Sequence, residues 1–388
     1  MKTAIVGGGA AGFFLAVNLK ERCPQMQVTI FERSNHVLRK VKISGGGRCN
    51  CTNTFDDVRD LSSVYPRGHR LMKRLFKTFD YRDAYAWFQR HGVRLTVQDD
   101  HCVFPASQDS QSIIDCFLHH CRRLGVELRT GVAITHLQQL EDFDFIVFTT
   151  GGMSAQSSLR ELLSHPVEAP VPSLFTFAID DPALHQLMGT VVNSATAFLP
   201  GTKFRASGPL LITHWGMSGP AILKLSSYAA RHLADVHYQA PLCVNWTSAT
   251  EDDVRQQIQQ LIAQHPQKLI TTLHPFELPA RLWSFLTQRT GVSTKRFAEL
   301  SRKDLNRLAS ILTADTYTIA SRAPFKDEFV TCGGIALSSI DSSTLESRLR
   351  PHLYFAGEIL DIDSITGGFN FQAAWTTAYV VACAIVQA

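Results

Sequence analysis

The residues with the clearest chemical meaning are three glycines near the start of the chain, Gly7, Gly9 and Gly12. They follow a short apolar run and open a segment of helical periodicity, and Glu32 stands twenty residues after the last of them. In this pattern the first glycine permits a tight turn, the second lets a pyrophosphate approach the backbone, and the third lets helix and strand pack closely. Glu32 would accept hydrogen bonds from ribose hydroxyls, so we expect a dinucleotide here. Arg33 leaves open whether that ribose carries a 2′-phosphate.

A second glycine loop, Ser44 to Asn50, contains three consecutive glycines and follows the cations Arg39, Lys40 and Lys42. Consecutive glycines let the backbone approach a flat ring or a phosphate, and nearby cations offset negative charge. A domain that binds NAD alone has no use for such a loop. The alternative interpretation is a flexible surface loop with solvated charges.

The end of the chain repeats this chemistry. Gly357 and Glu358 follow the last apolar run, and the segment from Gly367 to Gln372 opens the last helical segment. Here again glycines stand beside a helix N-terminus, which favours anions. Such a pairing with an N-terminal nucleotide fold is typical of flavoproteins, so FAD is the expected dinucleotide. Taken alone, Glu358 could also be a loop acid or a helix cap.

The elements that must position these residues are predicted as α/β. Residues 3–31 give strand, helix and strand, the size of a parallel unit with a crossover helix. Residues 37–53, rich in Gly, Lys and Arg, are expected to form an ordered loop, and residues 133–137 a strand. Residues 166–246 are β-rich and residues 250–314 are helical, after which strand and helix patterns like those at the start of the chain return. We therefore predict a discontinuous Rossmann-type domain around an insert. The predicted domains are an FAD-binding domain (1–160 and 335–388), a β-rich inserted domain (161–249 and 315–334) and a helical subdomain (250–314).

Composition narrows the class of protein. The chain has 388 residues, a formal charge of +4, 45% hydrophobic residues and 19% charged residues, as expected of an ordered globular protein. Nine scattered cysteines favour a reducing compartment, and the pair Cys49 and Cys51 lacks metal-ligand spacing, so no metal site is expected. No apolar run approaches a membrane span, so we expect a soluble cytoplasmic protein without a membrane partner.

Five motifs in order resemble one known family across essentially the whole chain. They are the turn from Gly7 to Gly12, the loop from Ile43 to Asn53, and the segments Thr213 to Pro220, Thr331 to Gly334, and Phe355 to Asn370. The chain resembles the BaiN/YhiN-type (aminoacetone-oxidase-like) FAD flavoproteins. The resemblance implies a Rossmann-type FAD-binding domain interrupted by a β-barrel-like domain that carries a helical subdomain.

The resemblance also assigns cofactor contacts. It implies that the first glycine turn binds the pyrophosphate, that Glu32 and Arg33 bind the adenosine ribose, and that Val132 or Ala133 lies beside the adenine. The second loop and the C-terminal segment would surround the flavin. The full set of predicted cofactor residues is Gly7, Gly9, Ala10, Ala11, Gly12, Glu32, Arg33, Lys40, Ser44, Gly45, Gly46, Gly47, Arg48, Cys49, Asn50, Val132, Ala133, Thr150, Gly151, Gly152, Gly357, Glu358, Gly367, Gly368, Phe369 and Asn370.

A flavin performs hydride chemistry, so the chain needs no catalytic triad. His214 is the first candidate for a proton donor or substrate contact, since the turn that follows it could aim it inward; a structural histidine is an equal alternative. Arg48 is a second candidate, as a charge beside the flavin. Cys49 is a third, although an inert buried thiol is the simpler interpretation.

The predicted function is that of an FAD-dependent oxidoreductase that uses NAD(P)H as a possible reductant on a small molecule. Members of the resembling family are linked to dihydrouridine formation, which suggests a uridine of ribosomal RNA as an alternative substrate. The basic stretch Arg67 to Arg82, with Phe76, Phe79 and Tyr81, could then contact phosphates and bases. A solvated helix face is the simpler interpretation of that charge. An amine or aminoketone oxidase using O2 and a non-enzymatic flavin sensor are further alternatives.

Overall fold

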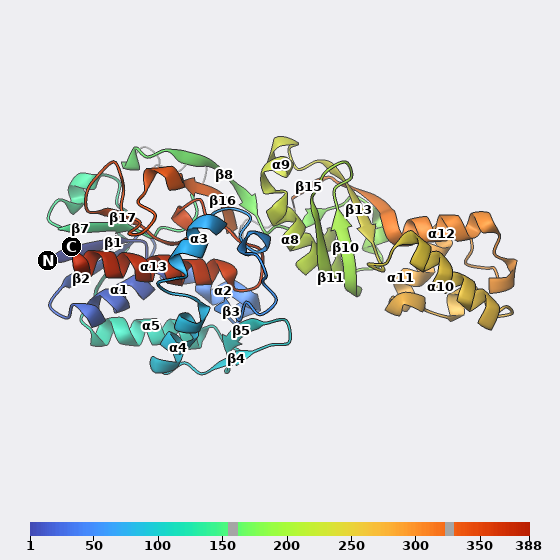
Figure 1. The fold of residues 1–388 in the computed structure, drawn as a ribbon, viewed down its shortest axis with the longest axis horizontal. Helices are drawn as coiled ribbons and strands as arrows, with labels where there is room; N and C mark the ends of the chain where they lie inside the picture. Colours follow the sequence, from blue (N-terminus) through green and yellow to red (C-terminus); the bar gives the residue numbers. More distant parts are fainter. Residues whose placement is uncertain (154–161, 323–329) are drawn as a thin grey trace. The chain divides into compact units, whose positions relative to one another are not determined.

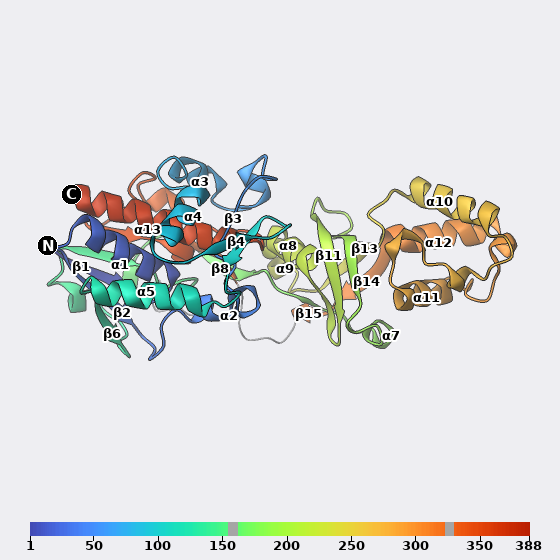
Figure 2. The same cartoon turned by 90° about the horizontal axis from the view of Figure 1, so that it is seen from below.

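The chain folds into two compact units, seen in the computed structural model, which describes residues 1–153, 162–322 and 330–388. The first unit contains Met1–Val171 and Val330–Ala388, and the second contains Pro172–Phe329 (Figures 1 and 2). The first unit is therefore discontinuous in sequence, as a fold with an inserted segment requires.

The first unit is built on a parallel sheet of five strands in the order β17-β7-β1-β2-β6. Four of its strands are apolar and mostly buried on both faces, whereas the edge strand β6 is polar and exposed. In chain order they are β1 (Lys2–Val6), β2 (Gln27–Glu32), β6 (Glu127–Thr130), β7 (Phe145–Phe148) and β17 (Leu353–Phe355). This confirms the predicted α/β class with a parallel sheet.

Three helices form the principal layer on this sheet: α1 (Ala10–Arg22), α5 (Gln111–Arg123) and α13 (Phe369–Gln387). Helix α13 packs along α1, which also contacts α5 (Figure 1). The ring of Phe14 joins them, with its centroid 5.2 Å from that of Trp375 and 6.4 Å from that of Phe117. Helix α13 is long and apolar enough to span a membrane, but 67% of its apolar window is buried inside the protein, which identifies it as a core helix.

Smaller elements surround this core. They are α2 (Arg39–Gly47), α3 (His69–Leu75), α4 (Tyr81–Arg90), an antiparallel sheet of β3 (Thr52–Asn53), β5 (Cys102–Pro105) and β4 (Leu95–Val97), and the 3-10 turns Leu61–Ser63, Leu137–Leu140, Leu337–Ser339 and Gly357–Ile359. Two local predictions were wrong. Residues 39–43 are helical where a loop was expected, and no strand forms over 133–137.

Both predicted boundaries of the insert are shifted: the first unit extends to Val171 and not to residue 160, and it resumes with strand β16 (Val330–Ile335). The sequence assigned residues up to 334 to the insert, whereas β16 pairs with β8 (Val167–Ser173) and belongs to the first unit. Its glycines explain why. A Cβ at Gly333 would lie 2.5 Å from the Ala169 carbonyl oxygen, and one at Gly334 would lie 2.4 Å from that of Ile359. The two glycines therefore let β16 pack tightly against residues of the first unit.

The second unit contains an antiparallel sheet in the order β14-β13-β10-β11-β12-β9-β15. Its two ends, β14 and β15, are separated by one residue, Ala320, so a single stretch of chain pairs at both edges and closes the sheet into a barrel. The strands are β9 (Phe177–Ala178), β10 (Val191–Phe198), β11 (Arg205–Thr213), β12 (Gly216–Ser218), β13 (Ala240–Asn245), β14 (Asp315–Ile319) and β15 (Ser321–Arg322).

The helices of the second unit share its core. Buried residues of the sheet, such as Leu242, belong to the same hydrophobic cluster as Trp283 and Leu308 from the helical segment. The helical segment predicted as a subdomain thus packs continuously with the barrel. The helices are α7 (Pro182–His185), α8 (Pro220–Tyr228), α9 (Ala230–Asp235), α10 (Glu251–Gln264), α11 (Ala280–Arg289) and α12 (Arg302–Ala314), with 3-10 turns at Ile270–Thr272, Pro275–Glu277 and Phe297–Glu299.

Candidate functional site

The turn between β1 and α1 shows what each of its glycines does. A Cβ at Gly7 would lie 2.5 Å from the Thr149 carbonyl oxygen, and one at Gly12 would lie 2.1 Å from the Gly7 carbonyl oxygen. Both positions are therefore restricted to glycine by packing. At Gly9, by contrast, a Cβ would meet no atom within 4 Å. No side chain caps α1, which begins there. The open position and the free N–H groups of the first helical turn suit an anion.

Glu32, at the end of β2, is held beside this turn. Its Oε2 accepts a hydrogen bond from the Gly8 N–H, and its Oε1 accepts one from the Ser34 N–H, both at 2.9 Å. The Val132 N–H donates to the Glu32 carbonyl oxygen at 2.9 Å, which brings the predicted adenine contacts Val132 and Ala133 to the same corner. Arg33 is exposed. The predicted ribose and adenine residues thus lie together.

The second glycine loop begins where α2 loses its helical backbone. Gly45, Gly46 and Gly47 all have positive φ, at 56°, 68° and 84°. A Cβ at Gly46 or Gly47 would meet no atom of the described residues within 4 Å, so these two glycines serve backbone conformation and leave open space, among those residues, beside the loop. The Cys49 N–H donates to the Ser44 carbonyl oxygen at 3.0 Å and closes the loop.

Two catalytic candidates lie in this loop. The Arg48 side chain donates to the Gly45 carbonyl oxygen at 3.2 Å and to Gln108 Oε1 at 3.1 Å, and its guanidinium stacks 4.2 Å from the Phe104 ring centroid. These contacts fix the loop. Cys49 is fully buried, and burial raises the pKa of its thiol to about 12. A thiol that stays protonated at neutral pH is a poor nucleophile, so the inert interpretation of Cys49 is favoured.

Glu358 joins four parts of the chain. Its Oε2 forms an ion pair with Lys40 Nζ at 2.7 Å, and its Oε1 accepts a hydrogen bond from the Thr331 N–H at 2.9 Å. A Cβ at Gly152 would lie 2.2 Å from Thr331 Oγ1, and one at Gly357 would lie 3.0 Å from the Cβ of Ala11. Glu358 is therefore a structural link between α2, β16 and the strand ends.

The N-terminus of α13 is tied to the second loop. Gly368 has φ 90°, and a Cβ there would lie 2.2 Å from the Thr52 carbonyl oxygen. With its amide oxygen toward Gly368, the Asn50 side chain accepts from the Gly368 N–H at 3.2 Å and donates to the Thr52 carbonyl at 3.0 Å. The Asn370 side chain bonds the backbone of Ser364. No side chain caps α13.

These contacts converge on one edge of the parallel sheet. The first glycine turn, Glu32, the segment Thr149–Gly152 and the segment Gly357–Glu358 follow β1, β2, β7 and β17, which are four neighbouring strands. Ligands of open α/β sheets bind outside the carboxyl ends of the strands. Thr150 Oγ1 is buried there without a hydrogen-bond partner among the described residues. Two uncapped helix N-termini, the open glycines and this hydroxyl fit a dinucleotide.

His214 lies in the second unit. It is exposed in the two-residue turn between β11 and β12, with its ring centroid 4.4 Å from that of Trp215. None of the cofactor residues described above belongs to that unit. The sequence motif around His214 therefore forms a hairpin turn, and a role in proton transfer stays a prediction.

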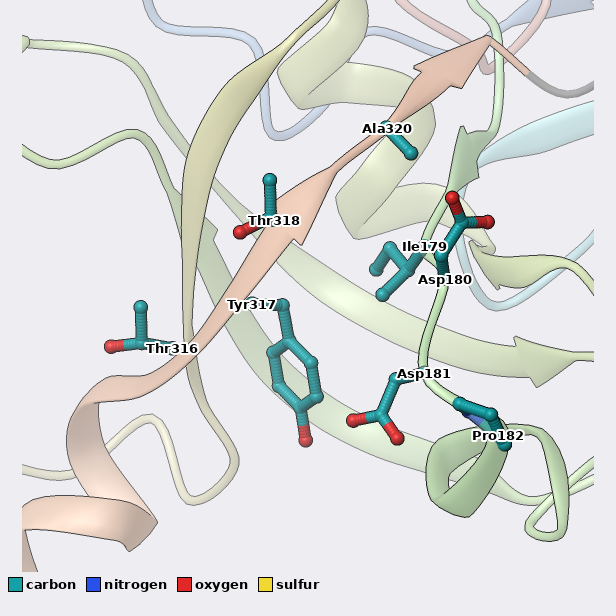
Figure 3. Close-up of a pocket in the computed structure, with 8 residues that line it drawn as sticks. All are labelled: Ile179, Asp180, Asp181, Pro182, Thr316, Tyr317, Thr318 and Ala320. Atoms are coloured by element: carbon teal, nitrogen blue, oxygen red, sulfur yellow. The ribbon is translucent and has the colours of Figure 1, made fainter.

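The second unit also contains a cavity of about 420 Å³, beside β14 (Figure 3). Its polar lining is already used in the fold. Asp181 accepts hydrogen bonds from the backbone of α7, and the Tyr317 hydroxyl donates to Asp315 Oδ2 at 2.5 Å. The other lining residues are Ile179, Asp180, Pro182, Thr316, Thr318 and Ala320. None of the predicted site residues lines it.

Two charged groupings could not be predicted from the sequence. Asp363, fully buried, forms an ion pair with Arg67, and the two positions lie 296 residues apart, beyond any local pattern. Glu21, His91 and His120 place possible metal-ligand atoms within 4.8 Å of one another. His91 Nε2 and Glu21 Oε1 are 2.9 Å apart, and the Arg123 guanidinium lies 3.1 Å from His120 Nδ1. Since this cation stands beside the histidine, we assign no metal there.

Comparison with known proteins agrees with this geometry. A family model described as "HI0933-like protein Rossmann domain" matches residues 1–384. A ribosomal RNA dihydrouridine synthase from Escherichia coli (strain K12) is 27% identical over 407 residues, which cover 99% of this chain and 98% of the relative. A ribosomal RNA dihydrouridine synthase from Haemophilus influenzae is 26% identical and covers 98% and 97%.

A third relative acts on a different compound. A 3-dehydro-bile acid delta(4,6)-reductase from Clostridium scindens is 25% identical over 413 residues, which cover 100% of this chain and 99% of the relative. Among solved structures, the 3-ketosteroid delta1-dehydrogenase from Sterolibacterium denitrificans matches with a TM-score of 0.48 at 10% identity and covers 99% of both chains. That likeness is too distant to bear on function.

Proposed function

We propose that this chain, which belongs to the HI0933-like Rossmann domain family and is an FAD-dependent oxidoreductase, reduces a uridine of ribosomal RNA to dihydrouridine with NAD(P)H. The reaction saturates one carbon–carbon double bond. NAD(P)H provides a hydride, the medium provides a proton, and the products are dihydrouridine and NAD(P)+. The reaction and its substrate imply a cytoplasmic protein, as the sequence predicts.

The match to the two ribosomal RNA dihydrouridine synthases carries this proposal, since it extends over nearly the full length of each chain. The third relative supports the type of reaction. A uracil ring and a 3-oxo compound with double bonds at positions 4 and 6 both have a double bond conjugated to a carbonyl group. Hydride addition to such a bond places negative charge on the carbonyl oxygen, so one kind of site suits both substrates.

Bound FAD supplies the hydride chemistry. The chain's own residues hold and orient it. The uncapped N-terminus of α1 would bind the pyrophosphate, Glu32 would accept hydrogen bonds from the ribose hydroxyls, and the backbone at Gly46 and Gly47 would leave room for a flat ring. The N-terminus of α13 adds partial positive charge at the other end of the site. His214 is the candidate proton donor, and the variant His214→Ala tests its role in proton transfer.

Anaerobic mixing with NADH and then NADPH, followed by ribosomal RNA from a strain that lacks the gene, tests the proposal. We expect NAD(P)H to bleach the flavin absorbance and the RNA to restore it, with one dihydrouridine formed per NAD(P)H consumed, as measured by mass spectrometry of RNA digests. RNA that neither reoxidises the flavin nor gains dihydrouridine contradicts the proposal. Free uridine serves as the control substrate.

A second candidate is the reduction of a small unsaturated carbonyl compound, favoured by the match to the bile acid reductase over 100% of this chain. The same reduced protein, mixed with a 3-oxo-4,6-diene steroid in place of RNA, separates the two. Reoxidation by the steroid alone favours the second candidate. Rapid reoxidation by O2 in the presence of an aminoketone would instead favour the oxidase alternative.

A further inference from the structure

We propose that the exposed face of α3 binds the phosphate backbone of ribosomal RNA. This face, here called the cationic α3 face, consists of Arg70, Lys73, Arg74 and Lys77. The proposal rests on the proposed function, and it names the surface of the first unit that takes the RNA substrate.

The four cations lie on one side of the helix. Their spacing of three, one and three residues places them on one face of an α-helix. All four are exposed, whereas Leu71, Met72 and Leu75 on the opposite face are buried. The turn continues past the end of α3, because the Lys77 N–H donates to the Arg74 carbonyl oxygen at 3.2 Å. The helix thus faces the core with apolar groups and presents four positive charges on the other side.

None of these four charges forms an ion pair among the described residues, although Lys73 interacts electrostatically with Asp60. Helix α3 itself contains no acidic residue. On α10, by contrast, Arg255 pairs with both Glu251 and Asp252. Four cations on two helical turns repel one another, and a polyanion relieves that repulsion.

The residues that precede α3 contact the segment that leads into α13. The buried Tyr65 hydroxyl donates to the Phe369 carbonyl oxygen at 2.8 Å, and Arg67 pairs with Asp363. Gly68, the residue before α3, lies so close to Ile362 that a Cβ there would be 2.7 Å from its side chain. RNA held on α3 is therefore held by the substructure that forms one end of the cofactor site.

The neighbouring aromatic residues do not support base stacking, contrary to the sequence prediction. Phe79 is buried and stacks on Tyr379, with 4.3 Å between ring centroids. Phe76 and Tyr81 both pack against Phe55, at 5.4 and 4.9 Å. The surface thus offers charge alone. It is suited to sequence-independent contacts with phosphates, and the choice of uridine is left to the cofactor site.

The test compares two charge-reversal variants of the full chain. One replaces Arg70, Lys73, Arg74 and Lys77 with Glu. The matched control replaces Arg90, Arg94, Arg302 and Lys303, which are also exposed and form no ion pair among the described residues, with Glu. Both variants change the formal charge from +4 to −4. Circular dichroism and FAD content confirm folding, and Gln at the four α3 positions provides a milder variant.

Binding of a transcribed ribosomal RNA fragment is measured by fluorescence anisotropy over a series of salt concentrations. Each lost phosphate contact lowers the slope of log affinity against log salt by roughly 0.7–0.9, so we expect the α3 variant to lose about 3 units of slope and on the order of 1000-fold in affinity at 0.1 M salt. The control should change far less. Equal losses in both variants, or none in the α3 variant, overturn the proposal.

Two further outcomes separate this proposal from the proposed function. If wild-type protein forms dihydrouridine in RNA and the α3 variant binds RNA as the control does, the function stands and the surface is wrong. If wild-type protein forms none, the function is wrong, and the surface stands only if the α3 variant alone loses RNA binding. Selective loss of binding to anionic phosphatidylserine vesicles, with RNA binding kept, assigns the face to a membrane and overturns the proposal.

Discussion

The helices that begin at the cofactor edge of the first unit differ from two helices of the second unit in how their N-termini are satisfied. In the first unit, α1 and α13 begin at glycines and no side chain caps them. In the second unit, Thr250 and Ser301 form capping boxes on α10 and α12. A capping side chain satisfies N–H groups that would otherwise bind an external partner. The contrast is confined to these helices, since Asp80 forms a capping box on α4 in the first unit, and α8 and α11 in the second unit have no side-chain cap among the described residues. It indicates that α1 and α13 keep their N–H groups available for a ligand, whereas α10 and α12 satisfy their own.

Two partnered carboxylates, Glu358 and Asp315, differ in their surroundings. In the first unit Glu358 is part of an edge that also contains open glycines and an unpartnered hydroxyl. In the second unit Asp315 is surrounded by its own partners: the Arg289 guanidinium at 2.8 Å, the Trp246 indole N–H at 3.0 Å and the Tyr317 hydroxyl at 2.5 Å. Asp315 therefore stabilises the fold, and changes at the two carboxylates should have different consequences.

The largest expected effect is that of Asp315→Ala. It leaves the buried Trp246 and Tyr317 donors without an acceptor and breaks the pair with Arg289, so we expect a loss of about 3 kcal/mol in the free energy of unfolding. Hydrogen exchange should rise in peptides of the second unit while FAD content at low temperature stays unchanged. Asp315→Asn, which keeps an acceptor, should lose less. FAD loss with unchanged exchange would contradict the assignment.

A smaller effect on stability is expected from Gly12→Ala in the first unit. The new Cβ would lie 2.1 Å from the Gly7 carbonyl oxygen, so α1 must move away from the turn. We expect a loss of about 1–3 kcal/mol together with loss of FAD, because the same turn serves packing and binding. Thermal unfolding and the ratio of flavin to protein absorbance measure the two. Unchanged stability together with unchanged FAD binding would show that the turn is looser than the structure indicates.

Glu358→Gln should affect binding more than folding. Its partner Lys40 is 54% exposed, so loss of the ion pair should cost less than about 1 kcal/mol of stability. The pair also joins α2 to the strand edge, so we expect FAD affinity to fall by about tenfold through a looser second loop. Lys40→Met is the complementary variant and should match it. Unequal effects of the two changes would mean that the pair does not act as a unit.

The smallest effect concerns a charge pair distant from the cofactor edge. The hydrogen bond from His91 lowers the pKa of Glu21 below its ordinary value of 4.5. A lowered pKa stabilises the folded state above that value, and the stabilisation disappears as the pH falls through the folded-state pKa. Wild-type protein should exceed Glu21→Gln in stability by less than about 1 kcal/mol at pH 7, as measured by urea unfolding, and by progressively less as the pH falls below 4.5. A difference that grows in acid would contradict this sign.

Much of the first unit could be predicted because its signals are local. The glycine turn, Glu32 and the helical periodicity of α1 and α13 each lie within a few residues, and the structure places them at one sheet edge. The ion pair between Arg67 and Asp363 could not be predicted, because it joins distant parts of the chain. The place of β16 depends on close packing at Gly333 and Gly334. Residues 39–43 were predicted as a loop because three glycines and several cations obscured one helical turn.

We conclude that positions at the carboxyl edge of the parallel sheet where a Cβ would meet no described atom, Gly9 above all, are kept open for the cofactor and are not needed for the fold. Gly9→Val tests it most directly, because a side chain there meets no protein atom within 4 Å at its Cβ. FAD affinity, measured by fluorescence quenching after removal and return of the cofactor, should fall by about 100-fold or more, while the melting temperature of the FAD-free protein stays as in the wild type. Unchanged FAD affinity, or a melting temperature lowered without FAD, would contradict the account.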